Sequence, residues 1–182
     1  MIDFGHSVYL DRFDRDNLGF IRDERNNFEI RRWCRQTNLI YNEGQDLWFD
    51  RQMQDPTIEM YGVYDNKDLE IRGVCGLTDI DQHNRRAEFS LYIFRQDQKK
   101  GFGKNALLTL FNHGFNNLNL NCIWGETFAG NPALNLFKSI GMKEEGIRRE
   151  FYLKHGQYID CHLESILLSE WKQSEYNRPM EI

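Results

Sequence analysis

Alternating apolar and polar residues mark short runs in the first half of the chain, and the alternation predicts β-strands. The runs are 8–13, 59–64, 69–78 and 87–94. Only short polar turns join the last three, and strands joined so closely pair antiparallel. The sequence therefore predicts a first strand followed, later in the chain, by a three-stranded antiparallel meander.

Two segments between the first strand and the meander have helical character, 16–27 and 42–54. Asn42 is expected to cap the second helix, because a short polar side chain can accept a hydrogen bond from the first free backbone N–H groups. Apolar residues of this helix are expected to form a stripe that faces the core: Leu47, Trp48 and Met53.

The second half of the chain changes to longer-range alternation of helix and strand. Helical spacing over 104–115 precedes a strand over 122–128. A helix then begins at Pro132 and ends at Gly141, and the segments 146–154 and 157–168 form a hairpin. The element order β-α-α-β-β-β-α-β-α-β-β predicts an α/β fold of the α+β type: one domain with a mixed, mostly antiparallel sheet flanked by helices.

The loop between the meander and the next helix carries the pattern Q-x-x-G-x-G, formed by Gln98, Gly101 and Gly103. Two glycines at a loop-to-helix junction leave backbone N–H groups open, and a helix N-terminus adds aligned donors and partial positive charge. This combination predicts an anion site, most naturally for a pyrophosphate. Mobile positive charge comes from Lys99, Lys100 and Lys104.

Two other interpretations of this loop stay open on its residues alone. A G-x-G pair is also found in an ordinary strand-to-helix turn, where glycine serves only the shape of the backbone. The segment 101–106 also fits the dinucleotide fingerprint G-x-G-x-x-A, although six polar residues, 95–100, separate it from the preceding strand. That fingerprint requires its glycines directly at a strand end, so we rank NAD well below other pyrophosphates.

Composition limits the class of protein. The chain has 182 residues, 40% of them hydrophobic, and a net charge of −5 with both signs scattered, which argues against a nucleic-acid partner. The four cysteines form no C-x-x-C and the five histidines lack ligand spacing, so we expect reduced thiols and no metal site. The N-terminal segment lacks an apolar signal core, and no run reaches membrane-spanning length. We therefore expect a cytoplasmic protein without a membrane partner.

Three motifs in order resemble the GNAT superfamily of acetyl-CoA-dependent N-acetyltransferases. The first is the Q-x-x-G-x-G loop, and the second is 131–142, which is similar to the family segment N-x-x-A/S-x-x-x-Y-x-x-x-G-F. The third is the closing hairpin, 149–158, which resembles the branch of ribosomal-protein N-terminal acetyltransferases and spermidine acetyltransferases. The resemblance covers roughly the whole chain and is strongest over 86–168.

The resemblance implies acetyl-CoA as cosubstrate and suggests how it is held. The backbone of Leu91, Tyr92 and Ile93 would pair with the pantetheine arm as an added strand does. The glycine loop, 98–104 with Phe102 at its centre, would hold the pyrophosphate. Asn131 would contact a pantetheine amide, and as an alternative or in addition it caps the helix that begins at Pro132.

For catalysis the resemblance implies a carboxylate that takes a proton from the acceptor amine. Glu150 is the first candidate, with a surface ion pair to a neighbouring arginine as the alternative. Glu88 is the second, and a solvated or ion-paired strand residue is the alternative there. Phe137 departs from the family, which often has at this position a tyrosine thought to protonate the leaving thiolate; phenylalanine cannot donate a proton.

Acceptor contacts are expected from Trp33, Trp48 and Tyr152, although core packing would also explain the two tryptophans. The resemblance implies direct attack of a primary amine on the thioester. The amine belongs to a small molecule or peptide: a protein N-terminus, a polyamine or an amino sugar. An acetyl-CoA-binding module without transfer activity is the alternative, and a dinucleotide-binding domain is a remote one. We expect a monomer or homodimer.

Within the single domain, 1–182, the resemblance divides the chain by role. The divisions are an acceptor-side strand and helices at 1–56, the meander at 57–94, the CoA-binding loop with helix, strand and helix at 95–145, the closing hairpin at 146–168 and a tail at 169–182.

Overall fold

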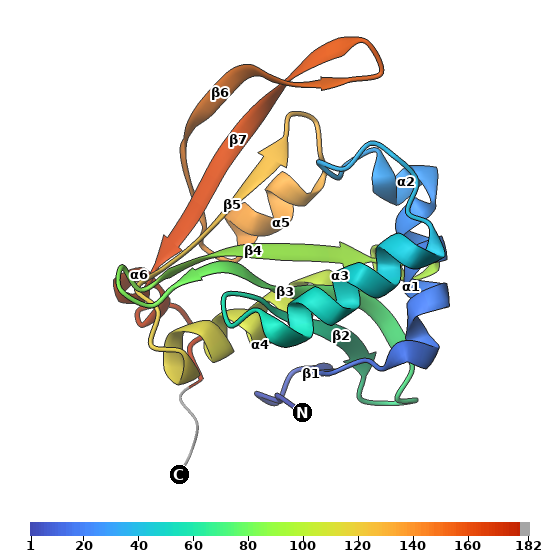
Figure 1. Cartoon of the computed structure of the whole chain (residues 1–182). Helices are drawn as coiled ribbons and strands as arrows, with labels where there is room; N and C mark the ends of the chain where they lie inside the picture. The colour runs from blue at the N-terminus through green and yellow to red at the C-terminus, as the bar shows by residue number, and fades with distance from the viewer. Residues whose placement is uncertain (179–182) are drawn as a thin grey trace.

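The computed structural model describes residues 1–178 and is built on one seven-stranded sheet with the order β1-β2-β3-β4-β5-β7-β6. All neighbouring strands pair antiparallel except β4 and β5, which pair parallel. The strands are β1 (Val8–Asp11), β2 (Glu59–Asp65), β3 (Ile71–Asp81), β4 (Arg86–Ile93), β5 (Cys122–Phe128), β6 (Lys143–Lys154) and β7 (Gln157–Leu167). In Figure 1, β6 and β7 rise from the body as a two-stranded arm.

Helices cover both faces of the sheet. They are α1 (Arg15–Asn26), α2 (Phe28–Arg31), α3 (Asn42–Gln54), α4 (Phe102–Asn112), α5 (Ala133–Ser139) and α6 (Leu168–Trp171), with a 3₁₀ turn at Arg95–Asp97 and a π-helical turn at His113–Asn117. Helices α1 and α3 pack with a small apolar cluster that includes Val74 and Phe94. The larger cluster, with Leu107, Phe111 and Trp171 at its centre, lies on the α4 face.

The predicted order of strands and helices is confirmed, and most boundaries shift by only one to three residues. Helices α2 and α6 were not predicted, because each is a single turn of four residues, too short for a periodic signal. The predicted N-cap at Asn42 is wrong. Tyr41 occupies that position, without a side-chain cap, and Asn42 is the first helical residue.

The predicted apolar stripe of α3 is also wrong in part. Trp48 packs toward the sheet beside Phe13, but Leu47 is 71% exposed and Met53 is 55% exposed. Residues 47 and 53 are six apart, which at about 3.6 residues a turn places them on different sides of the helix. The buried side is instead marked by Gln45, a polar residue that a hydrophobic pattern does not detect.

Strands β4 and β5 separate partway along their length, and the candidate active site lies at this separation. They pair only from Arg86 and Cys122 to Glu88 and Trp124, although both strands continue. Figure 1 shows β5 rising away from β4 beyond this point. Phe89 follows the last pair, and its ring lies over Gly125, where an added Cβ would come within 2.3 Å of it.

Phe137 packs in the core of the protein. It is 5% exposed on α5, and its ring meets Phe89 edge-on with centroids 5.0 Å apart.

We expect Phe137→Ala to lower the free energy of unfolding by about 3–5 kcal/mol because it leaves a cavity, and Phe137→Leu to cost far less. Urea denaturation measures both. Leu47→Ala on the exposed side of α3 is the control and should change stability by less than about 0.5 kcal/mol; equal losses would show that residue 137 is not a core position.

Candidate active site

Glu88 lies at the last paired position before β4 and β5 separate, and only 3% of it is exposed. Arg35, from the loop between α2 and α3, places a guanidinium nitrogen 2.7 Å from its carboxylate. Burial raises the pKa of Glu88, and the nearby charge of Glu126 adds to the rise, while Arg35 opposes it. A carboxyl with a raised pKa beside a cleft is a candidate for proton exchange with a substrate.

A second carboxylate stands on the other side of the separation. Glu126 of β5 accepts a hydrogen bond from the hydroxyl of Tyr152 at 2.7 Å and pairs with Arg148 of β6. Burial and this hydrogen bond raise the pKa of Tyr152 to about 12, so its hydroxyl keeps its proton at neutral pH. The opening thus holds two buried carboxylates, each neutralised by one half-exposed arginine.

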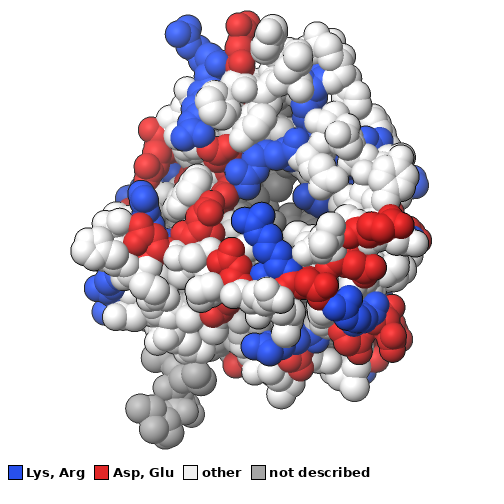
Figure 2. Space-filling view, in the orientation of Figure 1, with Lys and Arg blue, Asp and Glu red and all other residues white. Residues whose placement is uncertain are grey.

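A cleft of about 600 Å³ lies on the α3 side of the sheet next to Glu88. Thr78, which lines it, is the cross-strand partner of Glu88. Ser90 and Tyr92 of β4 form part of its floor, and Trp48 and Glu43 of α3 form part of its wall. Successive strand residues point to opposite faces, so Glu88 shares this face with Ser90 and Tyr92. Figure 2 shows the surface hollowed between the arm and the body, with Lys and Arg side chains at the rim.

On the α4 side of the sheet, the start of α4 lies beside the edge of β4. Beyond Glu88, β4 has no strand paired along its β5 side within residues 1–178. Gly103 faces Leu91 and Ile93 of β4 and Leu136 of α5, and a Cβ added there would lie 3.5–3.7 Å from all three side chains. The missing side chain therefore leaves room between β4 and α5.

The glycine loop enters α4 through a residue in the left-handed conformation. Gly101 has a φ of 92°, which few residues other than glycine adopt, and it directly precedes the first turn of α4. Gln98 ties the loop to the strand by donating from Nε2 to the carbonyl of Ile93 at 3.1 Å. The free N–H groups of a helix N-terminus with positive partial charge attract phosphate oxygens.

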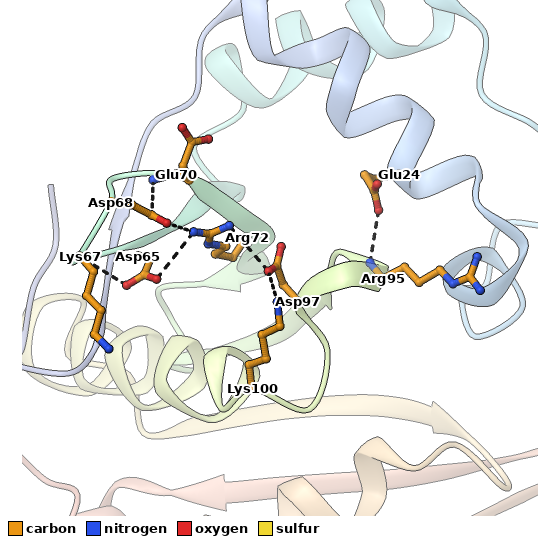
Figure 3. Close-up of polar contacts among 9 residues, drawn as sticks. All are labelled: Glu24, Asp65, Lys67, Asp68, Glu70, Arg72, Arg95, Asp97 and Lys100. Atoms are coloured by element: carbon orange, nitrogen blue, oxygen red, sulfur yellow. Dashed lines mark hydrogen bonds and ion pairs between the residues drawn. The ribbon is translucent and has the colours of Figure 1, made fainter.

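The three lysines of the loop differ in their surroundings. Lys100 donates to Asp97 at 3.1 Å, and Arg72 holds the same carboxylate oxygen at 3.7 Å (Figure 3). Arg72 also pairs with Asp65 and Asp68 in the turn before β3, so the loop is braced from the meander. Lys104 instead points to Tyr176, with its nitrogen 3.1 Å from the hydroxyl, and Lys99 is exposed.

Asn131 precedes the N-cap position of α5, which Pro132 occupies, but it still bonds to the first turn of the helix. Its side-chain oxygen accepts a hydrogen bond from the backbone N–H of Ala133 at 3.0 Å. The amide nitrogen of the same side chain, which is a donor only, is not used by this bond.

Two further predicted residues, Glu150 and Trp33, have other surroundings. Glu150 is exposed on β6, in a stretch where the register with β7 shifts, and its backbone N–H donates to Asp160 at 2.7 Å. Trp33 stacks under Arg32 and does not line the 600 Å³ cleft. Sequence reasoning missed Arg35, Glu126 and Arg148. They lie on a loop, on β5 and on β6, and no local sequence pattern links these three segments.

Known proteins with similar sequences are acetyltransferases. The model of the acetyltransferase (GNAT) domain matches residues 8–143. An uncharacterised N-acetyltransferase of Bacillus licheniformis, p20, is 36% identical over 103 residues, 56% of this chain and 58% of that protein. Spermidine N(1)-acetyltransferase of Escherichia coli K12 is 30% identical over 156 residues, 84% of this chain and 82% of that protein.

A solved structure of an acetyltransferase also superposes on almost the whole chain. A crystal structure of spermidine N-acetyltransferase from Vibrio cholerae in complex with CoA and spermine superposes with a TM-score of 0.85 at 26% identity. The alignment covers 90% of this chain and 97% of that one.

Residues 1–178 show neither a metal site nor a membrane-spanning helix. No group of three or more His, Cys, Asp or Glu side chains is placed to hold a metal ion. No helix in the same range has the length and apolar character of a membrane-spanning segment. The chain belongs to the GNAT family, and it is an acetyl-CoA-dependent N-acetyltransferase.

Proposed function

We propose that the protein transfers the acetyl group of acetyl-CoA to a primary amine of a polyamine, with Glu88 as the base. The observation that carries the proposal is the position of Glu88: buried, with a raised pKa, where β4 and β5 separate. Gly103 lies on the α4 side of β4, and the cleft lies on its α3 side. In this proposal the thioester and the amine meet beside the one carboxylate of Glu88.

The chemistry of the cleft supports a polyamine acceptor. Leu39, Ile40, Trp48 and Met60 give it apolar walls, and its charged lining residues are Glu43 and Arg25. A polyamine is an aliphatic chain with ammonium groups, so such walls would cover its methylenes while carboxylates attract its charges. The spermidine acetyltransferases among the relatives point the same way. A protein N-terminus or an amino sugar lacks the long methylene chain.

Acetyl-CoA would lie along residues already predicted for it. Its pyrophosphate would accept hydrogen bonds from the loop at 101–104, with Lys99 and Lys100 nearby. Its pantetheine arm would pair with the free edge of β4 at 91–93 and pass the gap left by Gly103. The amide nitrogen of Asn131 could donate to a pantetheine carbonyl while the oxygen bonds to the first turn of α5.

The reaction needs one proton removed and one supplied. Glu88 takes a proton from the ammonium group, directly or through a water, and the free amine forms a bond to the acetyl carbon as the carbon–sulfur bond breaks. The nitrogen releases its second proton as the amide forms, which balances the proton that the thiolate takes up. The leaving thiolate takes up a proton, which Phe137 cannot provide. Tyr152 supplies a protonated hydroxyl in the same cluster. A monomer or homodimer stays a prediction.

Substitution of the two candidate bases tests this assignment. Glu88→Gln should lower kcat by roughly 10²–10⁴-fold, because the amide cannot accept the proton. The loss should shrink at high pH, where the amine deprotonates unaided. Glu150→Gln is the matched control and should stay near wild type. CoA release is measured across pH with spermidine, a peptide with a free N-terminus and an amino sugar.

The outcomes separate the alternatives. A large loss in Glu150→Gln with an active Glu88→Gln would restore the first sequence-based candidate. Turnover of the peptide or amino sugar but not of spermidine would contradict the polyamine acceptor. Lack of CoA release with every amine would favour the binding module without transfer.

The gap beside Gly103 predicts a binding defect without a folding defect. Gly103→Val should weaken acetyl-CoA binding by at least about tenfold, or 1.4 kcal/mol, because the side chain enters the space of the pantetheine arm. The Cβ at 103 makes only ordinary contacts, and the melting temperature of the variant checks that its two Cγ atoms are accommodated as well. Calorimetry measures the affinity, and Gly19→Ala in the open middle of α1 is the control. Unchanged affinity for acetyl-CoA, or tight binding of NAD, would refute this placement.

A further inference from the structure

Lys154, the last residue of β6, has an ammonium group enclosed at the tip of the arm. The residue is 4% exposed. Its nitrogen donates to the backbone carbonyls of Arg31 at 3.2 Å, Arg32 at 3.0 Å and Cys34. It also lies 4.9 Å from the ring centre of Phe128 at the end of β5.

This enclosure is unusual for a lysine, and the three carbonyls account for it. An ammonium group has three donors, and burying it is costly unless each donor is satisfied. The carbonyls belong to the end of α2 and the turn after it, where a helix concentrates negative partial charge. One side chain therefore joins the arm, β5 and the loop after α2.

The loop that Lys154 holds continues directly into the active site. Cys34, whose carbonyl it binds, precedes Arg35, and Arg35 pairs with Glu88 at 2.7 Å. Arg35 comes from an irregular segment, so its position is not set by a helix or strand of its own. The ammonium of Lys154 is thus two contacts away from the proposed base, although the residues lie on separate elements.

We propose that Lys154 is a positioning residue for acetyl transfer: by holding the carbonyls of 31–34, it places Arg35 on Glu88 and fixes the charge beside the base. This inference rests on the proposed function of Glu88. Lys154 contacts neither substrate in this scheme and acts only through Arg35.

The charges around Glu88 give the proposal a specific signature. Arg35 faces it from the loop after α2, Glu126 from β5 and Asp79 from β3, and of these only Arg35 lowers the pKa of Glu88. Tyr152 of β6 borders the same cluster, and Arg25, Arg31 and Cys34 surround Lys154. Loosening Arg35 therefore raises the pKa of Glu88, so the base becomes active only at higher pH.

The test compares Lys154→Met, Lys154→Arg and Arg35→Gln in the full chain with spermidine as acceptor. Lys154→Met should lower kcat/KM by up to about 100-fold, as small misplacements in a catalytic site do. The acid limb of its pH profile should move to higher pH, as in Arg35→Gln, while acetyl-CoA affinity stays unchanged. Lys154→Arg, which keeps charge and donors, should restore much of the activity. Lys67→Met, an exposed lysine in the turn before β3, is the control.

A double variant decides between positioning and mere stabilisation. Lys154→Met combined with Arg35→Gln should be no worse than Arg35→Gln alone, because both act through one contact. Multiplied losses, or a wild-type acid limb in Lys154→Met, would overturn the inference. If Lys154→Met does not fold, Lys154→Gln, which keeps two donors, is measured in the same way. An active Glu88→Gln would refute the proposed function instead, so the two failures are distinguishable.

Discussion

The separation of β4 and β5 after a short parallel pairing is the constraint on which the site depends. A continuous sheet would satisfy the backbone of β4 on both sides. Within residues 1–178, pairing with β5 stops at Glu88 and Trp124, so β4 has an unpaired edge beyond this point. Phe89 over Gly125, and Phe137 against Phe89, pack aromatic rings where the two strands separate, so core packing holds them apart.

The features that sequence could predict are those encoded over short distances. Strand alternation, the polar turns of the meander and the glycine loop depend on neighbouring residues, and they occur where predicted. The single turns α2 and α6 carry too few residues for a period, and the stripe on α3 failed because Leu47 and Met53 do not share a helix side. Which side of α3 is buried depends on how the sheet lies beneath it.

The residues around Glu88, in contrast, could not be predicted from short stretches of sequence. Arg35, Glu88, Glu126 and Tyr152 come from a loop and three strands, and only the sheet order brings them together. In the sequence, each of these residues alone resembles an ordinary polar residue of the surface. Glu150 was favoured by the family resemblance, but its side chain is exposed in the structure. A motif gives the position of a residue along the hairpin and not the direction of its side chain.

The two faces of the sheet also bear on the route of transfer. In the proposed function, acetyl-CoA lies on the Gly103 side of β4 and the amine enters from the 600 Å³ cleft on the other face, so the two substrates approach Glu88 from opposite sides. A covalent acetyl-enzyme would need a reactive nucleophile there. Cys161 lies 3.8 Å from Glu126, but burial and that carboxylate raise the pKa of its thiol to about 11. A thiol that stays protonated is a poor nucleophile, and direct attack by the amine fits this geometry better.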